Sequence, residues 1–187
     1  LPNAPAVLPA RGTGNYDPVW KELSARRETG NCAMNNERKK PQTMPQAMPL
    51  QGLRVIEAAS VIAGPTIGMH LADFGADVIK IEHPAGDALR ATGAQKDGVG
   101  LWFKMANRNK RLITLKLSTP EGQAIFKDLA RSADVMIENF RTGTFEKWGL
   151  GWEDLKAINP GLVMVRVTGF GQTGPYKARP GFGTIAE

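Results

Sequence analysis

The sequence has 187 residues, of which 42% are hydrophobic and 22% charged, so it is long enough for one soluble domain with a core of ordinary size. Half of the formal net charge of +6 lies in residues 1–46, and the rest is spread thinly, without a basic helix or a stripe of cations and aromatic rings, which disfavours nucleic-acid binding. There is no run of about 18 apolar residues that would span a membrane, and the single cysteine, Cys32, fits neither a disulfide framework nor a metal site.

Residues 1–48 are predicted to form a poorly ordered, proline-rich leader. Proline recurs through this segment and its apolar residues show no sustained period, so it cannot bury enough apolar surface to offset the entropy of ordering. The segment lacks the apolar core of a secretory signal, and its four acidic residues are unlike a mitochondrial leader. We therefore expect the protein to be located in the cytoplasm and residues 49–187 to form its folded domain. Met44 or Met48 would be a more natural first residue than Leu1.

The regular pattern begins at Leu50. Residues 53–58 are rich in β-forming side chains and predict a strand. Pro65 suits the first turn of a helix over residues 66–74, which Gly75 ends. Residues 77–82 predict a second strand. A strand, a helix and a strand within about 30 residues form a βαβ unit, which implies a parallel sheet.

Alternating elements continue to the end of the sequence. A loop over residues 86–100 precedes a short helix, and Ser118 and Glu121 have the spacing of a capping box at the start of a longer helix. The further helices are expected at 101–106, 118–132, 145–148 and 153–158, and the further strands at 111–117, 135–138 and 162–168. This order predicts an α/β fold with a Rossmann-like open, mostly parallel sheet and flanking helices.

Small residues fill the turn that follows the first predicted strand, residues 59–65. Ligands of α/β sheets bind at this edge, and such a turn at a helix N-terminus suits a phosphate, although a compact turn without a ligand fits equally well. The turn lacks the G-x-G-x-x-G pattern of dinucleotide sites. Glu82 stands where a ribose-binding acid would lie, but without those glycines a solvated acid at the end of the strand is favoured.

Three other polar segments can be interpreted either as ligand contacts or as ordinary structural features. His83 either contacts a base or phosphate or is an ordinary surface histidine, and residues 107–111 either meet phosphates with three cations or form a solvated turn. Arg141 and Lys147 can face an anion, while Phe140 or Trp148 packs either on an adenine or in the core.

The glycine-rich residues 169–176 predict a loop that is mobile or makes close backbone contact, with a mere long turn as the alternative. The sequence contains no H-E-x-x-H, C-x-x-C or P-loop pattern, so the residues alone name no reaction. They indicate an α/β domain whose loops at one edge of the sheet are suited to binding an anion, which would fit a phosphorylated cofactor.

Taken together, these segments resemble the class III CoA-transferases, the family of formyl-CoA transferase, carnitine CoA-transferase and 2-methylacyl-CoA racemase. The resemblance runs in unbroken order from Pro49 to Glu187. The matching stretches are residues 49–57, 63–65, 71–82, 107–111, 119–122, 133–140 and 169–176. The resemblance implies that residues 49–187 are the N-terminal, CoA-binding part of a truncated CoA-transferase large domain.

The family implies an interlocked homodimer that moves CoA from an acyl-CoA to a carboxylic acid, with coenzyme A as substrate and no metal. An aspartate attacks the thioester to form a mixed anhydride, and an enzyme–CoA thioester follows. Arg141 and Lys147 are the foremost candidates for phosphate contacts, and His83 departs from the arginine that the family often has there. The CoA contacts implied by the resemblance are Ile62, Ala63, His83, Leu115, Ser118, Asn139, Phe140, Arg141, Lys147, Arg179, Gly181 and Phe182.

The resemblance places the nucleophilic aspartate beyond Glu187, so no catalytic residue is assigned within the sequence and the fragment by itself is expected to be inactive. The racemases use an aspartate near the position of Gly183 and a histidine upstream, but here no histidine follows His83, which favours a transferase. A fragment of a racemase-like enzyme and a non-catalytic CoA-binding fragment are the alternatives.

Overall fold

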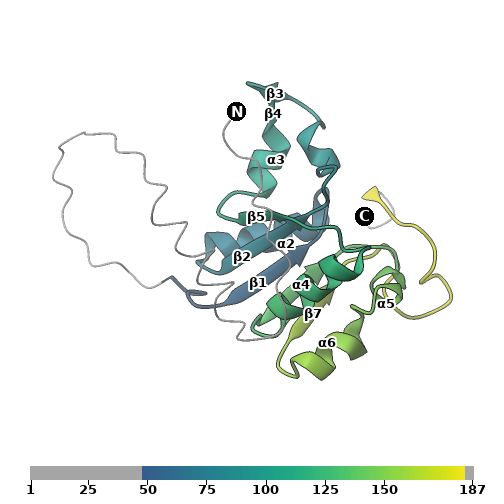
Figure 1. Cartoon of the computed structure of the whole chain (residues 1–187). Helices are drawn as coiled ribbons and strands as arrows, with labels where there is room; N and C mark the ends of the chain where they lie inside the picture. The colour runs from purple at the N-terminus through teal and green to yellow at the C-terminus, as the bar shows by residue number, and fades with distance from the viewer. Residues whose placement is uncertain (1–47, 184–187) are drawn as a thin grey trace.

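A computed structural model of the protein describes residues 48–183 (Figure 1). The predicted leader, apart from Met48, lies outside these residues. The centre of the fold is a five-stranded sheet in the order β5-β2-β1-β6-β7, in which every neighbouring pair is parallel. Its strands are β1 (Arg54–Ala58), β2 (Asp77–Glu82), β5 (Arg111–Thr114), β6 (Val135–Glu138) and β7 (Val163–Arg166). The predicted α/β fold with a parallel sheet is confirmed.

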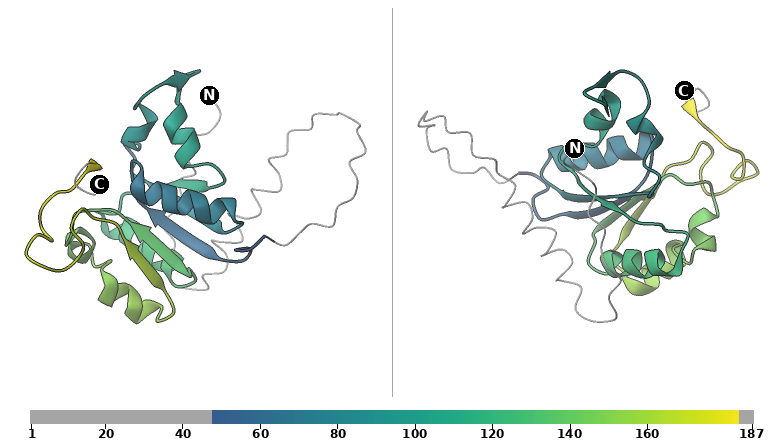
Figure 2. Two further views of the ribbon diagram at one scale, coloured as in Figure 1. Left: turned by 180° about the vertical axis from the view of Figure 1, so that it is seen from behind. Right: turned by 45° about the horizontal axis from the view of Figure 1, so that its top comes forward.

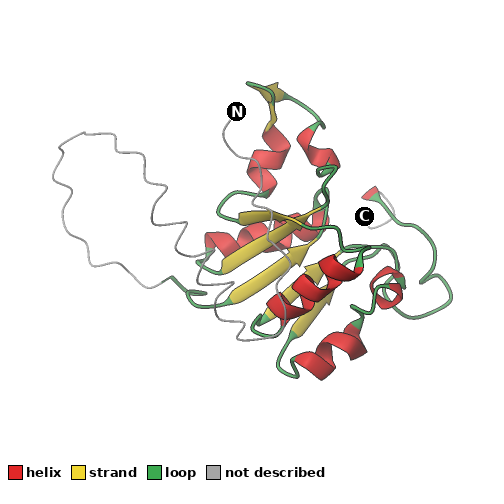
Figure 3. Ribbon diagram, viewed as in Figure 1, coloured by secondary structure: helices red, strands yellow, loops and turns green. Residues whose placement is uncertain are grey.

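Helices cover both faces of the sheet (Figures 2 and 3). One face carries α2 (Ala63–Asp73), with α3 (Leu101–Ala106) beside it. The other carries α4 (Pro120–Ala130), α5 (Thr144–Lys147) and α6 (Trp152–Ile158). Successive strand residues enter different cores because side chains alternate between the faces of a strand: Val55 packs on the α2 side and Ile56 packs with the α4 side.

The order of the strands creates a switch point. From β1 the chain moves outward through β2 to β5, and it then returns to the other side of β1 to form β6 and β7. The segments that follow β1 and β6 therefore start side by side at the carboxyl edge of the sheet and lead to helices on opposite faces. Ligands of open α/β sheets bind in the crevice at this point.

Several boundaries differ from those predicted. The strand predicted over 111–117 ends at Thr114, and the cap of α4 is Thr119, whose side chain accepts a 3.2 Å hydrogen bond from the Gly122 N–H, so the Ser118 capping box is wrong. The predicted loop 86–100 contains a 3₁₀ turn, η1 (Ala88–Arg90), and a hairpin of β3 (Gln95–Lys96) and β4 (Val99–Gly100). Asp97 and Gly98 both have positive φ there, as a two-residue hairpin turn requires. None of the helices in the described residues has the length and hydropathy needed to cross a bilayer.

Candidate ligand site at the carboxyl edge of the sheet

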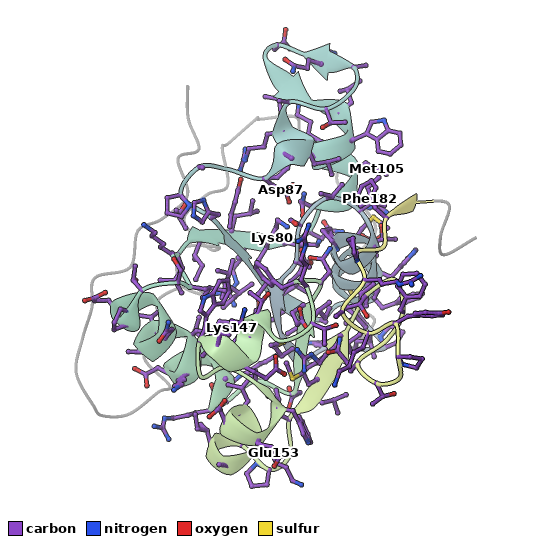
Figure 4. The ribbon with its side chains drawn as sticks, turned by 90° about the vertical axis from the view of Figure 1, so that its right-hand side faces the viewer. Lys80, Asp87, Met105, Lys147, Glu153 and Phe182 are labelled. Atoms are coloured by element: carbon purple, nitrogen blue, oxygen red, sulfur yellow. The ribbon has the colours of Figure 1, made fainter. Side chains whose placement is uncertain are left out.

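A cavity of about 360 Å³ opens where β1 and β2 end, which is within the size range of small-molecule sites. Figure 4 looks onto this edge and shows Lys80 and Asp87 close together and Lys147 apart from them on α5. The cavity is lined by Ala58, Ala59, Ser60, Val61, Lys80, Ile81, Glu82, His83, Gly86, Asp87, Ala88, Leu115, Leu117, Ser118, Phe140 and Trp148.

The floor of the cavity includes the turn that links β1 to α2. Asn139, which follows β6, bonds to both backbone groups of Ser60: its Oδ1 accepts from the Ser60 N–H at 2.9 Å, and its Nδ2 donates to the Ser60 carbonyl at 2.8 Å. Val61 has φ of 62°, a left-handed conformation that a β-branched residue rarely adopts. The two segments at the switch point are thus joined directly, and the residue after the joined Ser60 has a strained backbone.

A chain of buried charges lies beneath this turn. The fully buried Lys80 ammonium is 3.0 Å from Glu57 Oε1 and 3.3 Å from Asp87 Oδ2, and it donates to the Ala59 carbonyl at 2.6 Å. Asp87 also accepts from the Val61 N–H, at 3.2 Å to Oδ1. Because Glu57 and Lys80 occupy paired positions of β1 and β2, the register of the sheet itself forms their contact.

Lys110 extends the chain of charges to the helix face. Its ammonium is 2.6 Å from Glu57 Oε2 and donates to the Pro65 carbonyl at 2.7 Å. Burial lowers the pKa of Lys110 to about 8, although Glu57 opposes the shift. Gly68 of α2 lies over the Glu57 carboxylate, and a Cβ at that position would collide with it. The helix can therefore approach the strand only because residue 68 is a glycine.

Glu82, at the end of β2, is buried and paired. The Arg90 side chain donates to both of its oxygens, at 2.5 and 2.7 Å, and the Asp87 N–H donates to Oε1 at 2.7 Å. Burial acts to raise the pKa of Glu82, but Arg90, together with the Asp87 N–H and the charge of Lys80, outweighs it and lowers the pKa below its ordinary 4.5. The preference for a solvated acid here was therefore wrong.

Aromatic rings form the opposite wall. Phe140 and Trp148 line the cavity with their ring centroids 5.2 Å apart in an edge-to-face arrangement. Behind them the fully buried Phe145 lies 5.3 Å from Phe140 and 5.8 Å from Trp148, and its other side meets Phe126 at 5.7 Å. The wall presents two ring surfaces to the cavity and fixes them from behind.

A second glutamate–arginine pair lies at the end of β6. Glu138 is fully buried and accepts from Arg166 Nε at 2.6 Å and from the Phe140 N–H at 2.6 Å. Arg166 also pairs with the more exposed Glu146 at 2.5 Å. Burial raises the pKa of Glu138, and Arg166, which is shared with Glu146, does not offset it.

The predicted ligand contacts do not all meet in this cavity. Four of them line it: His83, Leu115, Ser118 and Phe140. The His83 Nδ1 accepts from the Ala85 N–H at 3.1 Å, which leaves Nε2 as the other ring atom for a ligand. Asn139 lies behind the lining and holds Ser60. All of these ligand contacts, including the four that line the cavity, stay predictions.

Ile62 and Ala63 are the N-cap and first residue of α2, next to the lining. Arg141 and Lys147 are exposed, after β6 and at the end of α5.

The remaining predicted contacts lie in the segment after β7. Arg179 stacks over the Tyr176 ring at 4.2 Å, and Phe182 is 79% exposed. Gly181 packs so closely against Gly169 that a Cβ on either would strike the other's backbone. This close backbone contact is one of the two features that the glycine content predicted for the loop.

Sequence reasoning missed the charged part of the site. The three cations of residues 107–111 meet carboxylates rather than a solvated turn: Arg108 bonds Asp73, Lys110 bonds Glu57 and Arg111 bonds Asp77. A signal was present for the buried chain, because Glu57 and Lys80 interrupt two apolar strands at similar depth. No such signal marked Asp87, whose role depends on the fold of the β2–η1 segment. Residues 48–183 hold no group of three or more His, Cys, Asp or Glu side chains placed to bind a metal ion.

Comparison with known proteins adds to this geometry. The model of CoA-transferase family III matches residues 50–187. The chain is 55% identical over 141 residues to Succinyl-CoA--D-citramalate CoA-transferase of Chloroflexus aurantiacus, an alignment covering 74% of this chain and 35% of that protein. It is 48% identical over 147 residues to Succinate--glutarate CoA-transferase of Agrobacterium fabrum, covering 74% of this chain and 37% of that protein.

A solved structure shares the fold. A CAIB/BAIF family protein from Brucella suis superimposes with a TM-score of 0.69 at 47% identity, covering 73% of this chain and 38% of that one. The chain thus spans a little over a third of the length of the curated relatives it matches, as the 35% and 37% coverages show.

Proposed function

This chain belongs to CoA-transferase family III, and from that premise we propose that it is the CoA-binding part of an enzyme that moves CoA from an acyl-CoA to a carboxylate. The observation that carries the proposal is the cavity at the switch point between β1 and β6, where a small-residue turn and an aromatic wall face each other. We further propose that the enzyme is a cytoplasmic, interlocked homodimer.

The aromatic wall suits the adenine end of CoA. Phe140 and Trp148 are aromatic rings in the lining of a mostly apolar cavity, and a base can stack on such rings whatever its edge pattern. Arg141 and Lys147 are exposed cations on the segments that carry this wall, which suits the phosphates of CoA. His83, across the cavity, supplies a further polar contact.

The turn suits the remainder of the cofactor. Ile62 and Ala63 begin α2, whose first N–H groups lack partners within the helix, and such groups bind anions or carbonyl oxygens. Ligand atoms that cross the carboxyl edge from Trp148 to Ala63 would carry the thioester end of the cofactor away from the aromatic wall. The proposal assigns binding to these residues and chemistry to an aspartate in the part of the enzyme beyond residue 187.

The chemistry is proposed from the family. The aspartate carboxylate attacks the thioester carbonyl and the C–S bond breaks, which gives a mixed anhydride and CoA thiolate. The thiolate attacks the aspartyl carbonyl and releases the donor as its carboxylate, which leaves an aspartyl–CoA thioester. The acceptor carboxylate and the thiolate repeat these two steps in reverse order. Relatives named for succinyl-CoA or succinate, with citramalate or glutarate, support dicarboxylates as donor and acceptor.

Titration calorimetry with CoA and the 187-residue chain tests the proposal. We expect saturable binding, and an increase in Kd of about 10- to 150-fold for Arg141→Ala or Lys147→Ala, because each removes a charge-assisted contact worth about 1.5–3 kcal/mol. Arg131→Ala is the matched control, since Arg131 is an exposed cation at the end of α4 near the opposite edge of the sheet. Absence of binding to the wild-type chain, or an equal loss in the control, would contradict the proposal.

A further inference from the structure

We propose that Asp87 and Asn139 are positioning residues that hold the β1–α2 turn in its ligand-binding conformation, so that the ligand meets a turn already formed. This inference rests on the proposed function, because it concerns the turn to which CoA binding is assigned. It gives a role to the buried charges beneath the turn, which no catalytic step requires.

Four side chains hold the turn by its backbone. Lys80 donates to the Ala59 carbonyl at 2.6 Å, and Asn139 bonds both the N–H and the carbonyl of Ser60. Asp87 accepts from the Val61 N–H, with both of its oxygens within 3.3 Å. Lys110 donates to the Pro65 carbonyl at 2.7 Å, in the first turn of α2. Three consecutive residues and the start of the helix are thereby fixed.

Val61 explains why the turn needs such support. Its φ of 62° is unfavourable for a β-branched residue, so the isolated turn would leave this conformation. Asp87 opposes that by fixing the direction of the Val61 N–H, and Lys80 holds the Asp87 carboxylate in turn. If the turn relaxed, the first N–H groups of α2 would lose their place beside the cavity.

Asp87 acts through the turn rather than on the ligand. Its side chain is only 2% exposed, and its oxygens are occupied by the Val61 N–H, the Leu89 N–H and Lys80. Lys80 is fully buried. Asn139 likewise spends its amide oxygen and nitrogen on Ser60. The polar atoms of Asp87, Lys80 and Asn139 are therefore occupied by other groups of the protein, and we assign none of them to the ligand.

The test uses a rescue by glycine. Asp87→Asn loses the charge that holds Lys80 and points an N–H toward that ammonium, so we expect the Kd for CoA to rise about tenfold as the competent turn becomes a minor state. Amide hydrogen exchange at Val61 should accelerate by a similar factor. Adding Val61→Gly should restore the Kd to within about threefold of wild type, because glycine adopts positive φ without support.

Two further variants separate positioning from general stability. Asp77→Asn removes the Asp77–Arg111 pair at the opposite edge of the sheet and should leave the Kd unchanged. Asn139→Ala leaves no unpaired buried charge, so it tests the proposal even where Asp87→Asn does not fold. It should weaken CoA binding, and Val61→Gly should not restore that binding, because the loss of Asn139 releases Ser60 and not Val61.

The inference is overturned if Asp87→Asn leaves exchange at Val61 unchanged, if Asp77→Asn weakens binding equally, or if glycine at position 61 restores nothing. If the wild-type chain does not bind CoA, the proposed function fails, while the exchange measurement without ligand still decides whether Asp87 holds the turn.

Discussion

The two walls of the cavity are built from opposite kinds of side chain. On the β2 side the wall consists of charged groups in matched pairs: Lys80 with Asp87 and Glu57, and Glu82 with Arg90. On the β6 side it consists of rings: Phe140 and Trp148 at the surface, with Phe145 behind them. We call these the charged wall and the aromatic wall.

The difference between the two walls predicts how well each tolerates a substitution. Every ion in the charged wall depends on a partner for its burial, so the loss of one member leaves an uncompensated charge. The ring packing of the aromatic wall is non-directional, so a smaller apolar side chain leaves a void but no unpaired group. The charged wall should therefore be intolerant of even size-matched changes, and the aromatic wall tolerant of them.

Lys80→Met should give the largest effect. The substitution keeps most of the volume of the side chain but leaves Asp87 without its cation, and we expect a loss of about 3–5 kcal/mol in the free energy of unfolding. Urea denaturation monitored by circular dichroism would measure it. Lys96→Met, an exposed lysine in the β3–β4 hairpin, is the matched control and should change stability by less than about 0.5 kcal/mol. Equal effects would remove the distinction between buried and surface lysines.

Trp148→Ala should come next, in binding rather than in stability. If the ring stacks on adenine, its loss should weaken CoA binding by about 1–3 kcal/mol, while binding of pantetheine, which lacks the base, stays the same. Trp152→Ala on α6, whose ring contacts Lys156 outside the cavity lining, is the control and should alter neither affinity. A parallel loss of pantetheine binding would mean that Trp148 supports the fold of the wall and not a base.

Phe145→Leu should cost less. Leucine fills most of the space of the ring against Phe126 and Phe140, and we expect a loss of about 1–2 kcal/mol in the free energy of unfolding. The comparison with Lys80→Met is direct, because both side chains are fully buried. A loss as large as that of Lys80→Met would show that the aromatic wall is as intolerant as the charged one.

The aromatic wall could be anticipated from the sequence, whereas the charged wall left only one signal, the charges of Glu57 and Lys80 within two predicted strands. Phe140 follows a strand that the apolar run 135–137 marks clearly, so its place at the ligand edge follows from local pattern. The charged wall depends on contacts between distant residues, such as Lys80 with Glu57, which only the register of the strands decides. The basic segment 107–111 therefore suggested a phosphate contact or a solvated turn, when its cations are paired with carboxylates of the fold.

The helix and strand boundaries that were predicted wrongly also lie where the local sequence pattern does not decide the structure. The strands 77–82 and 135–138 were predicted as they occur, since apolar content and length define them. The hairpin within residues 86–100 has strands of only two residues each, too short for a period, although the Asp97–Gly98 pair is a turn signal. The cap at Thr119 in place of Ser118 was a choice between two adjacent hydroxyls that the sequence does not resolve.

The smallest prediction concerns the two strand-end glutamates, one in each wall. Both pair with an arginine, yet the pKa of Glu82 is lowered from 4.5 and the pKa of Glu138 is raised from 4.5. A lowered pKa means that Glu82 contributes stability above pH 4.5 and that this contribution is lost as the pH falls through its folded-state pKa. A raised pKa means the reverse for Glu138, whose contribution is complete below pH 4.5 and is lost as the pH rises.

Urea titrations at several pH values would measure both slopes, each pKa unit being equivalent to about 1.4 kcal/mol. The stability of wild type relative to Glu82→Gln should decrease with falling pH, whereas its stability relative to Glu138→Gln should decrease with rising pH. Arg90→Met should weaken the first slope, because Arg90 lowers the pKa of Glu82 by its hydrogen bonds and its charge, while the Asp87 N–H and Lys80 still act. Slopes of the same sign would contradict the account in which Arg90 serves one carboxylate alone while Arg166 divides its charge between Glu138 and Glu146.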